Sequence, residues 1–225
     1  MAFAKALELI ISADREVLFI SMTSLSMAVI STVIATIPSL LLGITLSIKK
    51  FPGKSFIIII LNSLMAMPTV VIGLIIYSMI SRSGPFGGYG LLFTPWAIII
   101  GQCVLSFPII TSLIYSALSK ISIELTETLD TFGTGRFKKL YMIFRESRIA
   151  VLSAILSGFG RVIGEVGVSM MLGGNIRWYT RTITTTIALE TSKGDFELAL
   201  ALGLILIIIS FTVNSLLHMG IRRHV

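Results

Sequence analysis

The sequence predicts an all-α protein that crosses a membrane about five times. Of its 225 residues, 55% are hydrophobic and only 13% are charged, which is far more apolar than a soluble domain. Several apolar runs reach the roughly 20 residues that a helix needs to cross about 30 Å of hydrocarbon. One long charged segment, 121–148, separates these runs. We therefore predict a polytopic helical membrane protein with one extended loop outside the membrane.

The composition also limits the kinds of binding or reactive site that the chain can contain. Cys103 is the single cysteine and lies in an apolar run, so one chain offers no disulfide and no thiolate metal site. His218 and His224 lie near the C-terminal end, far from any acidic cluster, and we predict no metal site. The formal net charge is +7. Because the placement of basic residues around membrane spans explains most of it, we expect no nucleic-acid partner.

The chain opens with an amphipathic stretch. Phe3, Leu7 and Ile10 recur on one helical face, and the stretch is too short to span a membrane. It also lacks the cleavage pattern of a signal peptide. We predict that residues 1–16 form an interfacial segment, followed by a first span at 17–48 that is tilted or extends beyond the bilayer.

Prolines interrupt the next two predicted spans, 56–80 and 96–118. Pro68 lies near the middle of the first span, and Pro108 lies within the second. An internal proline frees a carbonyl and kinks a helix, which membrane proteins tolerate where the break is packed or wetted. We expect two hinged helices, which either serve packing alone or line a pathway.

The charged segment, 121–148, carries two amphipathic patterns. Apolar residues recur at helical spacing on both sides of Gly133, with acids on the first part and bases on the second. Gly133 stands where a helix C-terminus favours a residue without Cβ. The pattern predicts two short helices, joined at glycines, that dock onto a protein outside the membrane. The alternative is a solvated connector, which does not need two apolar stripes.

Polar residues repeat every four positions along the fourth predicted span, 149–172. Arg161 and Glu165 are spaced i, i+4 and can pair, which lowers the cost of placing either charge in a membrane. Ser157 lies one helical turn before them. We predict that Ser157, Arg161 and Glu165 line a translocation path or its gate, the alternative being a structural ion pair in a helix bundle.

The loop after the fourth span is rich in hydrogen-bond donors. Its amide, guanidinium and hydroxyl groups suit a tetrahedral dianion, although an ordinary interfacial loop has a similar composition. We predict that Asn175, Arg177 and Arg181 contact an external anion or a partner protein. The fifth span is predicted at 196–220, and a basic tail follows at 221–225.

Five spans place the two termini on opposite sides of the membrane. If the charged loop is cytoplasmic, the inside segments hold most of the lysines and arginines. The positive-inside rule then predicts an external N-terminus and a cytoplasmic C-terminus. Gly53-Lys54-Ser55 looks like the end of a phosphate-binding loop, but Ile48 occupies the place of the required first glycine. We therefore expect no ATPase activity and no cofactor in this chain.

The run 127–133, Glu-Thr-Leu-Asp-Thr-Phe-Gly, resembles the EAA loop of ABC importer permeases. In that family the loop is a coupling helix seated in a cleft of the cytoplasmic ATPase. Two alanines of the motif are replaced by Thr128 and Leu129, and Arg145-Glu146 replaces a common Leu-Pro pair. The stretch 164–203 looks closer to tungstate permeases than to molybdate permeases.

The resemblance implies a type-1 ABC transporter transmembrane domain over residues 17–220. It implies an oxyanion substrate, tungstate first, then molybdate, with sulfate or phosphate behind. It also implies a permease homodimer in the cytoplasmic membrane of a prokaryote, two ATPase subunits that hold ATP-Mg, and an extracytoplasmic oxyanion-binding protein. The residues that match the coupling motif or follow it are Glu127, Thr128, Leu129, Gly133, Arg136 and Phe137. A stand-alone ion-coupled secondary transporter is the alternative from another class, and the lack of a visible inverted repeat argues against it.

Overall fold

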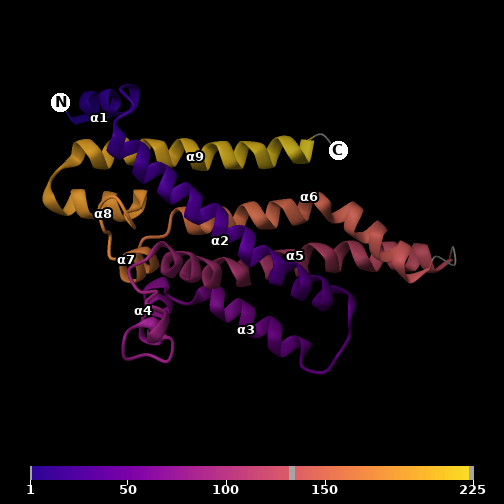
Figure 1. Ribbon diagram of the computed structural model, residues 1–225. Coiled ribbons are helices and arrows are strands. Elements are labelled where there is room, and N and C mark those ends of the chain that lie inside the picture. The colour runs from indigo at the N-terminus through magenta and orange to yellow at the C-terminus, as the bar shows by residue number, and fades with distance from the viewer. Residues whose placement is uncertain (1, 132–134, 223–225) are drawn as a thin grey trace.

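The computed structural model describes residues 2–131 and 135–222, and the elements assigned there are helices. Their bounds are α1 (Ala2–Ile11), α2 (Arg15–Ile48), α3 (Lys54–Ala66), α4 (Thr69–Ile80), the 3-10 turn η1 (Gly87–Tyr89), α5 (Pro95–Thr131), α6 (Arg136–Ile163), α7 (Gly167–Gly173), α8 (Ile183–Lys193) and α9 (Phe196–Arg222). The helices α5, α6 and α9 run along the long axis of the molecule, and α2 crosses them diagonally (Figure 1). At one end lie α1, α7 and α8, and at the other α5 and α6 approach their junction (Figure 1).

The predicted all-α, multi-span fold is confirmed. Three helical stretches are long and apolar enough to cross a membrane: Arg15–Ile48, Pro95–Ser119 and Phe196–Ser215. Two further spans are possible as bent pairs of helices. In one pair α3 and α4 meet at 102°, and in the other the part of α6 from Arg145 meets α7 at 61°.

The two internal prolines behave differently. Met67 and Pro68 separate α3 from α4, so the hinge expected at Pro68 is confirmed. Pro108 does not divide its helix, because α5 runs through this residue, and the kink expected there stays a prediction. Hydroxyl groups hold that turn: Thr111 donates to the carbonyl of Phe107 at 2.7 Å, and Ser39 of α2 donates to the same oxygen at 3.2 Å. Packing against α2 therefore supports the turn next to the proline, whereas the carbonyl that loses its helical N–H partner is that of Val104.

The charged segment also differs from the expectation of two separate short helices. Its first part is the end of α5, and its second part is the beginning of α6. The sequence between Leu118 and Thr131 contains no proline or glycine, so nothing local stops helix propagation out of the span. Each amphipathic stretch is thus continuous with a membrane-spanning helix.

The fourth predicted span is not one helix, and this part of the prediction is wrong. The helix α6 ends at Ile163 and α7 begins at Gly167, so the polar repeat does not follow a single helical face. Ser157 and Arg161 belong to α6, and Glu165 lies in the break. The helix α6 ends at the C-cap Gly164, and the N-cap of α7 is Val166. Oε1 of Glu165 accepts a hydrogen bond from the backbone N–H of Val168 at 3.3 Å and so satisfies one free donor in the first turn of α7.

The two largest of four buried clusters among the described residues join the central helices. In the first, Val168 and Leu172 of α7 pack with side chains of α4, α5 and α6. In the second, Ile110, Ile114 and Val151 join α5 to α6. Large apolar side chains on the outer faces of α2, α3 and α9 are exposed, as expected for surfaces that meet lipid or another subunit.

The N-terminal segment is attached to the last helix. Ala6 of α1 is buried, and α1 packs on α9. Nζ of Lys5 lies 2.7 Å from Oε1 of Glu197, and this hydrogen bond raises the pKa of Lys5 above its ordinary value. Asp14 caps α2 by accepting hydrogen bonds from two backbone N–H groups. This cap starts α2 at Arg15, two residues before the predicted start of the span.

Candidate functional site

The two broken spans meet at their breaks. A Cβ atom on Gly167, the first residue of α7, would lie 3.2 Å from Oγ1 of Thr69, the first residue of α4. One turn along α4, a Cβ on Gly73 would lie 3.2 Å from the sulfur of Met171. Glycines therefore let α4 and α7 approach closely. Irregular backbone at membrane depth is tolerated where protein packs around it or where it lines a water-filled path.

An ion pair occupies the α6–α7 break. Nη1 of Arg161 lies 2.7 Å from Oε2 of Glu165, so the pairing expected from their spacing is confirmed. The side chain of Glu165 is 4% exposed and that of Arg161 is 38% exposed. Thr184 of α8 donates its hydroxyl hydrogen to the backbone carbonyl of Glu165 at 2.8 Å. An arginine in the last turn of α6 and a glutamate ahead of α7 also match the dipoles of the two helices.

Ser157 lies on an exposed face of α6, beside a cavity between α5 and α6. The hydroxyl of Ser157 donates to the carbonyl of Ser153 at 2.8 Å. The cavity has a volume of about 490 Å³, and its polar lining comes from Ser116, Ser153, Ser157 and Glu146. Polar groups on membrane-spanning helices are costly against hydrocarbon. This face is therefore suited to water or to another protein rather than to lipid.

Gln102 is a structural polar residue that the sequence analysis missed. It is buried in α5, and its Oε1 accepts a hydrogen bond from the hydroxyl of Ser31 in α2 at 3.0 Å. Its Nε2 donates to the carbonyl of Val162, one residue before the end of α6, at 3.4 Å. The amide thus ties three helices together beside the α6–α7 break. The available signal was that Gln102 is the one amide side chain in its predicted span.

Arg177 and Arg181 converge on Glu16 at the start of α2. Nη2 and Nε of Arg177 lie 2.5 and 2.9 Å from the two carboxylate oxygens, which makes a bidentate pair. Nη1 of Arg181 lies 3.4 Å from Oε1 of Glu16, and the Nε of Arg181 is buried with no hydrogen-bond partner among the described residues. The bond to Glu16 raises the pKa of Arg177 above its ordinary value. The structure brings the two predicted arginines together around an acid that the sequence analysis did not assign.

Trp178 lies between these arginines in sequence and has a left-handed backbone, with φ of 61°. Its ring packs against Phe19 with 5.2 Å between centroids. The guanidinium groups of Arg15 and Arg177 lie 5.9 and 5.7 Å from its ring centroid. A bulky residue with positive φ is strained, so these contacts fix a loop conformation that the backbone alone disfavours.

The hydroxyl and amide donors of the same loop are used within the chain. Thr180 donates to a backbone carbonyl of α7, and Thr184 donates to the backbone at the α6–α7 break. Oδ1 of Asn175 accepts from the hydroxyl of Thr185 at 2.9 Å, and Nδ2 of Asn175 donates to the carbonyl of Thr185 at 3.5 Å. The three threonine side chains are buried. These groups hold α8 against α7, and their role toward an anion stays a prediction.

The predicted coupling residues belong to the ends of two helices: Glu127, Thr128 and Leu129 to α5, and Arg136 and Phe137 to α6. Gly133 lies outside the described residues. These helix ends lie at the opposite end of the molecule from α7 and α8 (Figure 1). The predicted coupling segment is therefore distant from the breaks. The continuous helices α5 and α6 extend from this segment toward the breaks.

Comparisons with known proteins extend over most of the chain. Residues 39–223 match the family described as "Binding-protein-dependent transport system inner membrane component". The chain is 39% identical over 216 residues to the tungstate uptake system permease protein of Peptoclostridium acidaminophilum, covering 96% of this chain and 95% of that protein. It is 39% identical to the tungstate uptake system permease protein of Campylobacter jejuni, covering 96% and 90%. Identity to the molybdenum transport system permease protein of Haemophilus influenzae is 29%, covering 73% and 76%.

A solved structure has the same fold. It is that of a methionine ABC transporter in inward facing conformations, which aligns with a TM-score of 0.67 and 16% sequence identity. The alignment covers 92% of this chain and 94% of that chain. At this identity the likeness concerns the arrangement of helices alone.

Proposed function

The chain belongs to the family of inner membrane components of binding-protein-dependent transport systems, and from this premise we propose that it is the membrane subunit of an ABC importer of tungstate. The observation that carries the proposal is the 39% identity, over nearly the whole length, to tungstate uptake permeases from two organisms. The chain is a transport subunit rather than an enzyme. Its family implies an ATPase and a substrate-binding protein as partners.

The proposed complex contains two copies of this chain in the cytoplasmic membrane of a prokaryote, with two ATPase subunits that bind ATP-Mg. The ends of α5 and α6 seat in the ATPases, through Glu127, Thr128, Leu129, Gly133, Arg136 and Phe137. The opposite end, with α1, α7 and α8, faces the extracytoplasmic binding protein, which places the N-terminus outside and the C-terminus inside. Movement of the ATPases reaches the breaks through two continuous helices.

The breaks are the proposed gate. Tungstate is a dianion, so entry into a membrane cavity requires donors that replace its water. Arg161 is partly exposed and Ser157 is exposed, and both lie on α6 just before the α6–α7 break. Glu165 holds Arg161 and accepts a hydrogen bond from the first turn of α7 at the same time. A shift of α7 against α4 would therefore move Glu165 and, with it, the guanidinium of Arg161. In this way opening of the gate would change the position of the charge that contacts the anion.

Molybdate is the second candidate substrate, and sulfate or phosphate follows. The relative that transports molybdenum is less similar and matches less of the chain. An ion-coupled secondary transporter would not need an ATPase, and the family membership disfavours it.

The test is uptake into proteoliposomes that contain this chain, its ATPase and its binding protein. We expect tungstate accumulation that requires internal ATP in the orientation described above, and that survives a proton ionophore. Molybdate should compete less well than unlabelled tungstate. Uptake that continues without ATP but stops with the ionophore would replace this proposal with a secondary transporter.

The coupling role has its own test, Gly133→Val. A β-branched residue resists positive φ, so this substitution should disrupt the predicted joint while membrane insertion survives. We expect co-purification of the ATPase and ATP-dependent uptake to fall together. Normal co-purification with normal uptake would exclude docking through this segment.

A further inference from the structure

We propose that a cavity enclosed by α4, the 81–94 loop and α5 binds one membrane phospholipid, with an acyl chain in the cavity and the phosphate beside Arg82. The cavity has a volume of about 460 Å³. That size falls within the range of ~300–1,000 Å³ that is usual for small-molecule sites. It is separate from the serine-lined cavity between α5 and α6.

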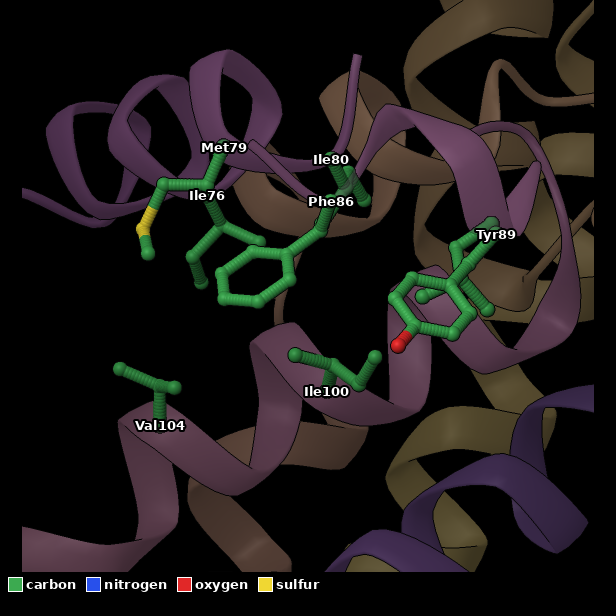
Figure 2. Close-up of a pocket in the computed structure, with 8 residues that line it drawn as sticks. Ile76, Met79, Ile80, Phe86, Tyr89, Ile100 and Val104 are labelled. Atoms are coloured by element: carbon green, nitrogen blue, oxygen red, sulfur yellow. The ribbon is translucent and has the colours of Figure 1, made fainter. Parts of the chain in front are cut away.

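The cavity wall is apolar on both sides. Figure 2 shows Ile76, Met79 and Phe86 on one side and Ile100 and Val104 of α5 on the other. Among the described residues no charged side chain lines the cavity, and the one lining hydroxyl belongs to Tyr89 at one end (Figure 2). Such a wall offers nothing to replace the water of an oxyanion, so this cavity does not serve the transported substrate. Hydrocarbon is the ligand that matches it.

The fold of the loop builds this cavity. The backbone N–H of Phe86 donates to the carbonyl of Met79 at 2.9 Å, which turns the loop back over the end of α4. A Cβ atom on Gly84 would overlap the carbonyl oxygens of Ser78 and Met79. Only glycine allows that turn, and the turn places the ring of Phe86 in the cavity wall.

The depth of the cavity suits an acyl chain. Tyr89, Phe93 and Trp96 are exposed aromatic residues around the end of the loop, and such residues sit at the headgroup level of a bilayer. Ile100 and Val104 lie four and eight residues beyond Trp96 on α5, which is about 6 and 12 Å deeper at 1.5 Å per residue. The cavity thus begins directly beneath the headgroups.

Charge complementarity in the loop that forms the rim of the cavity favours a phospholipid over another apolar helix, because the backbone of Arg82 lies close to Gly87, the neighbour of the lining residue Phe86. Arg82 is exposed in the same loop, and its charge matches a lipid phosphate. On α4, Leu74 and Ile75 precede the lining residue Ile76 and are exposed apolar residues. Ile76 lies one turn after Gly73, which contacts α7. A bound acyl chain would therefore hold α4 in place beside the α6–α7 break.

The first experiment replaces Val104, at the open side of the cavity, by a small diazirine amino acid (Val104→photo-leucine). The full transporter is reconstituted in vesicles of phosphatidylethanolamine and phosphatidylglycerol, extracted in mild detergent and irradiated. The control is the same substitution at Ile208 of α9, which is exposed and apolar and lies outside the cavity lining. We expect an adduct of one chain with one phospholipid from position 104 and little from position 208, where loosely held lipid is lost to detergent.

A second measurement covers the case in which the probe itself disturbs the cavity. Ile100→Trp fills the cavity, and Arg82→Gln removes the rim charge. Native mass spectrometry should find less retained phospholipid in both variants than in the wild type and in the Ile208→Trp control. The proposal is overturned if position 104 crosslinks to a second copy of the chain or to another subunit. Equal lipid retention in all four proteins would overturn it as well.

Discussion

Two ion pairs in this molecule have the same chemistry and different surroundings. Arg161 and Glu165 lie at the break between α6 and α7, where the carboxylate is almost completely buried. Arg177 and Glu16 lie at the outer end, where the guanidinium is 58% exposed. We call Arg161–Glu165 the inner pair and Arg177–Glu16 the outer pair. If one partner of the inner pair is lost, its carboxylate stays out of water, whereas the groups of the outer pair are rehydrated and screened by salt. The comparison indicates that the loss of a buried pair lowers the stability of the protein more than the loss of an exposed pair, even where the exposed pair has the better hydrogen-bond geometry.

The backbones around the two pairs are also held in different ways. At the inner pair, glycines permit contact between α4 and α7, and side chains from three other helices close the site. At the outer pair, two residues other than glycine, Asn175 and Trp178, have left-handed backbones that side-chain contacts must hold. The inner region is fixed by close packing, and the outer region is fixed by hydrogen bonds and by ring and charge contacts.

Loss of one inner partner should have the largest effect. Arg161→Met leaves Glu165 buried without its cation, which costs about 3–5 kcal/mol for a fully buried pair and less here because the arginine is partly exposed. We expect a marked fall in the thermal stability and in the yield of monodisperse protein. Arg177→Met is the matched comparison and should lower both properties less, because Glu16 keeps the nearby Arg181 as a partner. Equal effects of the two substitutions would remove the distinction between the pairs.

Close packing at the inner region predicts an intermediate effect for Gly101→Ala. A Cβ there would overlap Val168 and Leu172 of α7, and overpacking of this kind typically costs about 1–3 kcal/mol. The matched control is Gly203→Ala in α9, where a Cβ meets no atom within 4 Å. Thermal unfolding of both variants in the same detergent checks the difference. An unchanged Gly101→Ala protein would mean that α7 is not held tightly against α5.

The outer arginines should affect rate rather than stability. We expect Arg177→Gln/Arg181→Gln to slow tungstate uptake most at low ionic strength, with rescue by excess binding protein. The side chain of Arg177 is 58% exposed and acts mainly on association, whereas that of Arg181 is only 12% exposed and contributes less. Glu16→Gln frees the two guanidiniums and should speed uptake at low salt. Lys5→Gln, which breaks the exposed pair with Glu197, is the control. If Glu16→Gln slows uptake as much as the arginine variants do, the contacts between Glu16 and the two arginines serve only to hold the loop between α7 and α8 in place.

Local sequence signals account for the positions of the candidate spans and for one of their breaks. Apolar runs locate the membrane-crossing segments, and Pro68 marks the hinge between α3 and α4 because a proline must interrupt the hydrogen-bond ladder. At Pro108 the same signal does not end the helix: α5 runs through this residue, and the hydroxyls of Thr111 and Ser39 both donate to the carbonyl of the preceding Phe107. One of these bonds comes from another helix, so no window around Pro108 contains it.

The second break and the outer cluster could not be derived from the sequence. Arg161 and Glu165 have helical spacing, yet the helix stops between them, and Glu165 instead accepts a hydrogen bond from the first turn of α7 while Thr184 binds its carbonyl. Glu16 and Arg177 are separated by 161 positions, so their pairing depends on the packing of α2 against the end of the bundle. Spacing predicted the inner pair correctly, but its surroundings depend on tertiary contacts.

The role of the inner pair in transport has one direct test. In Arg161→Met/Glu165→Leu both charges are replaced by apolar groups of similar size, so no buried charge is left unpaired and the complex should assemble. The measurement is ATP-dependent tungstate uptake into proteoliposomes by this double variant, normalised to the amount of assembled complex. We predict normal assembly and little uptake, because the guanidinium that meets the anion is gone. Uptake at the wild-type rate would contradict the account and leave the pair as a structural feature only.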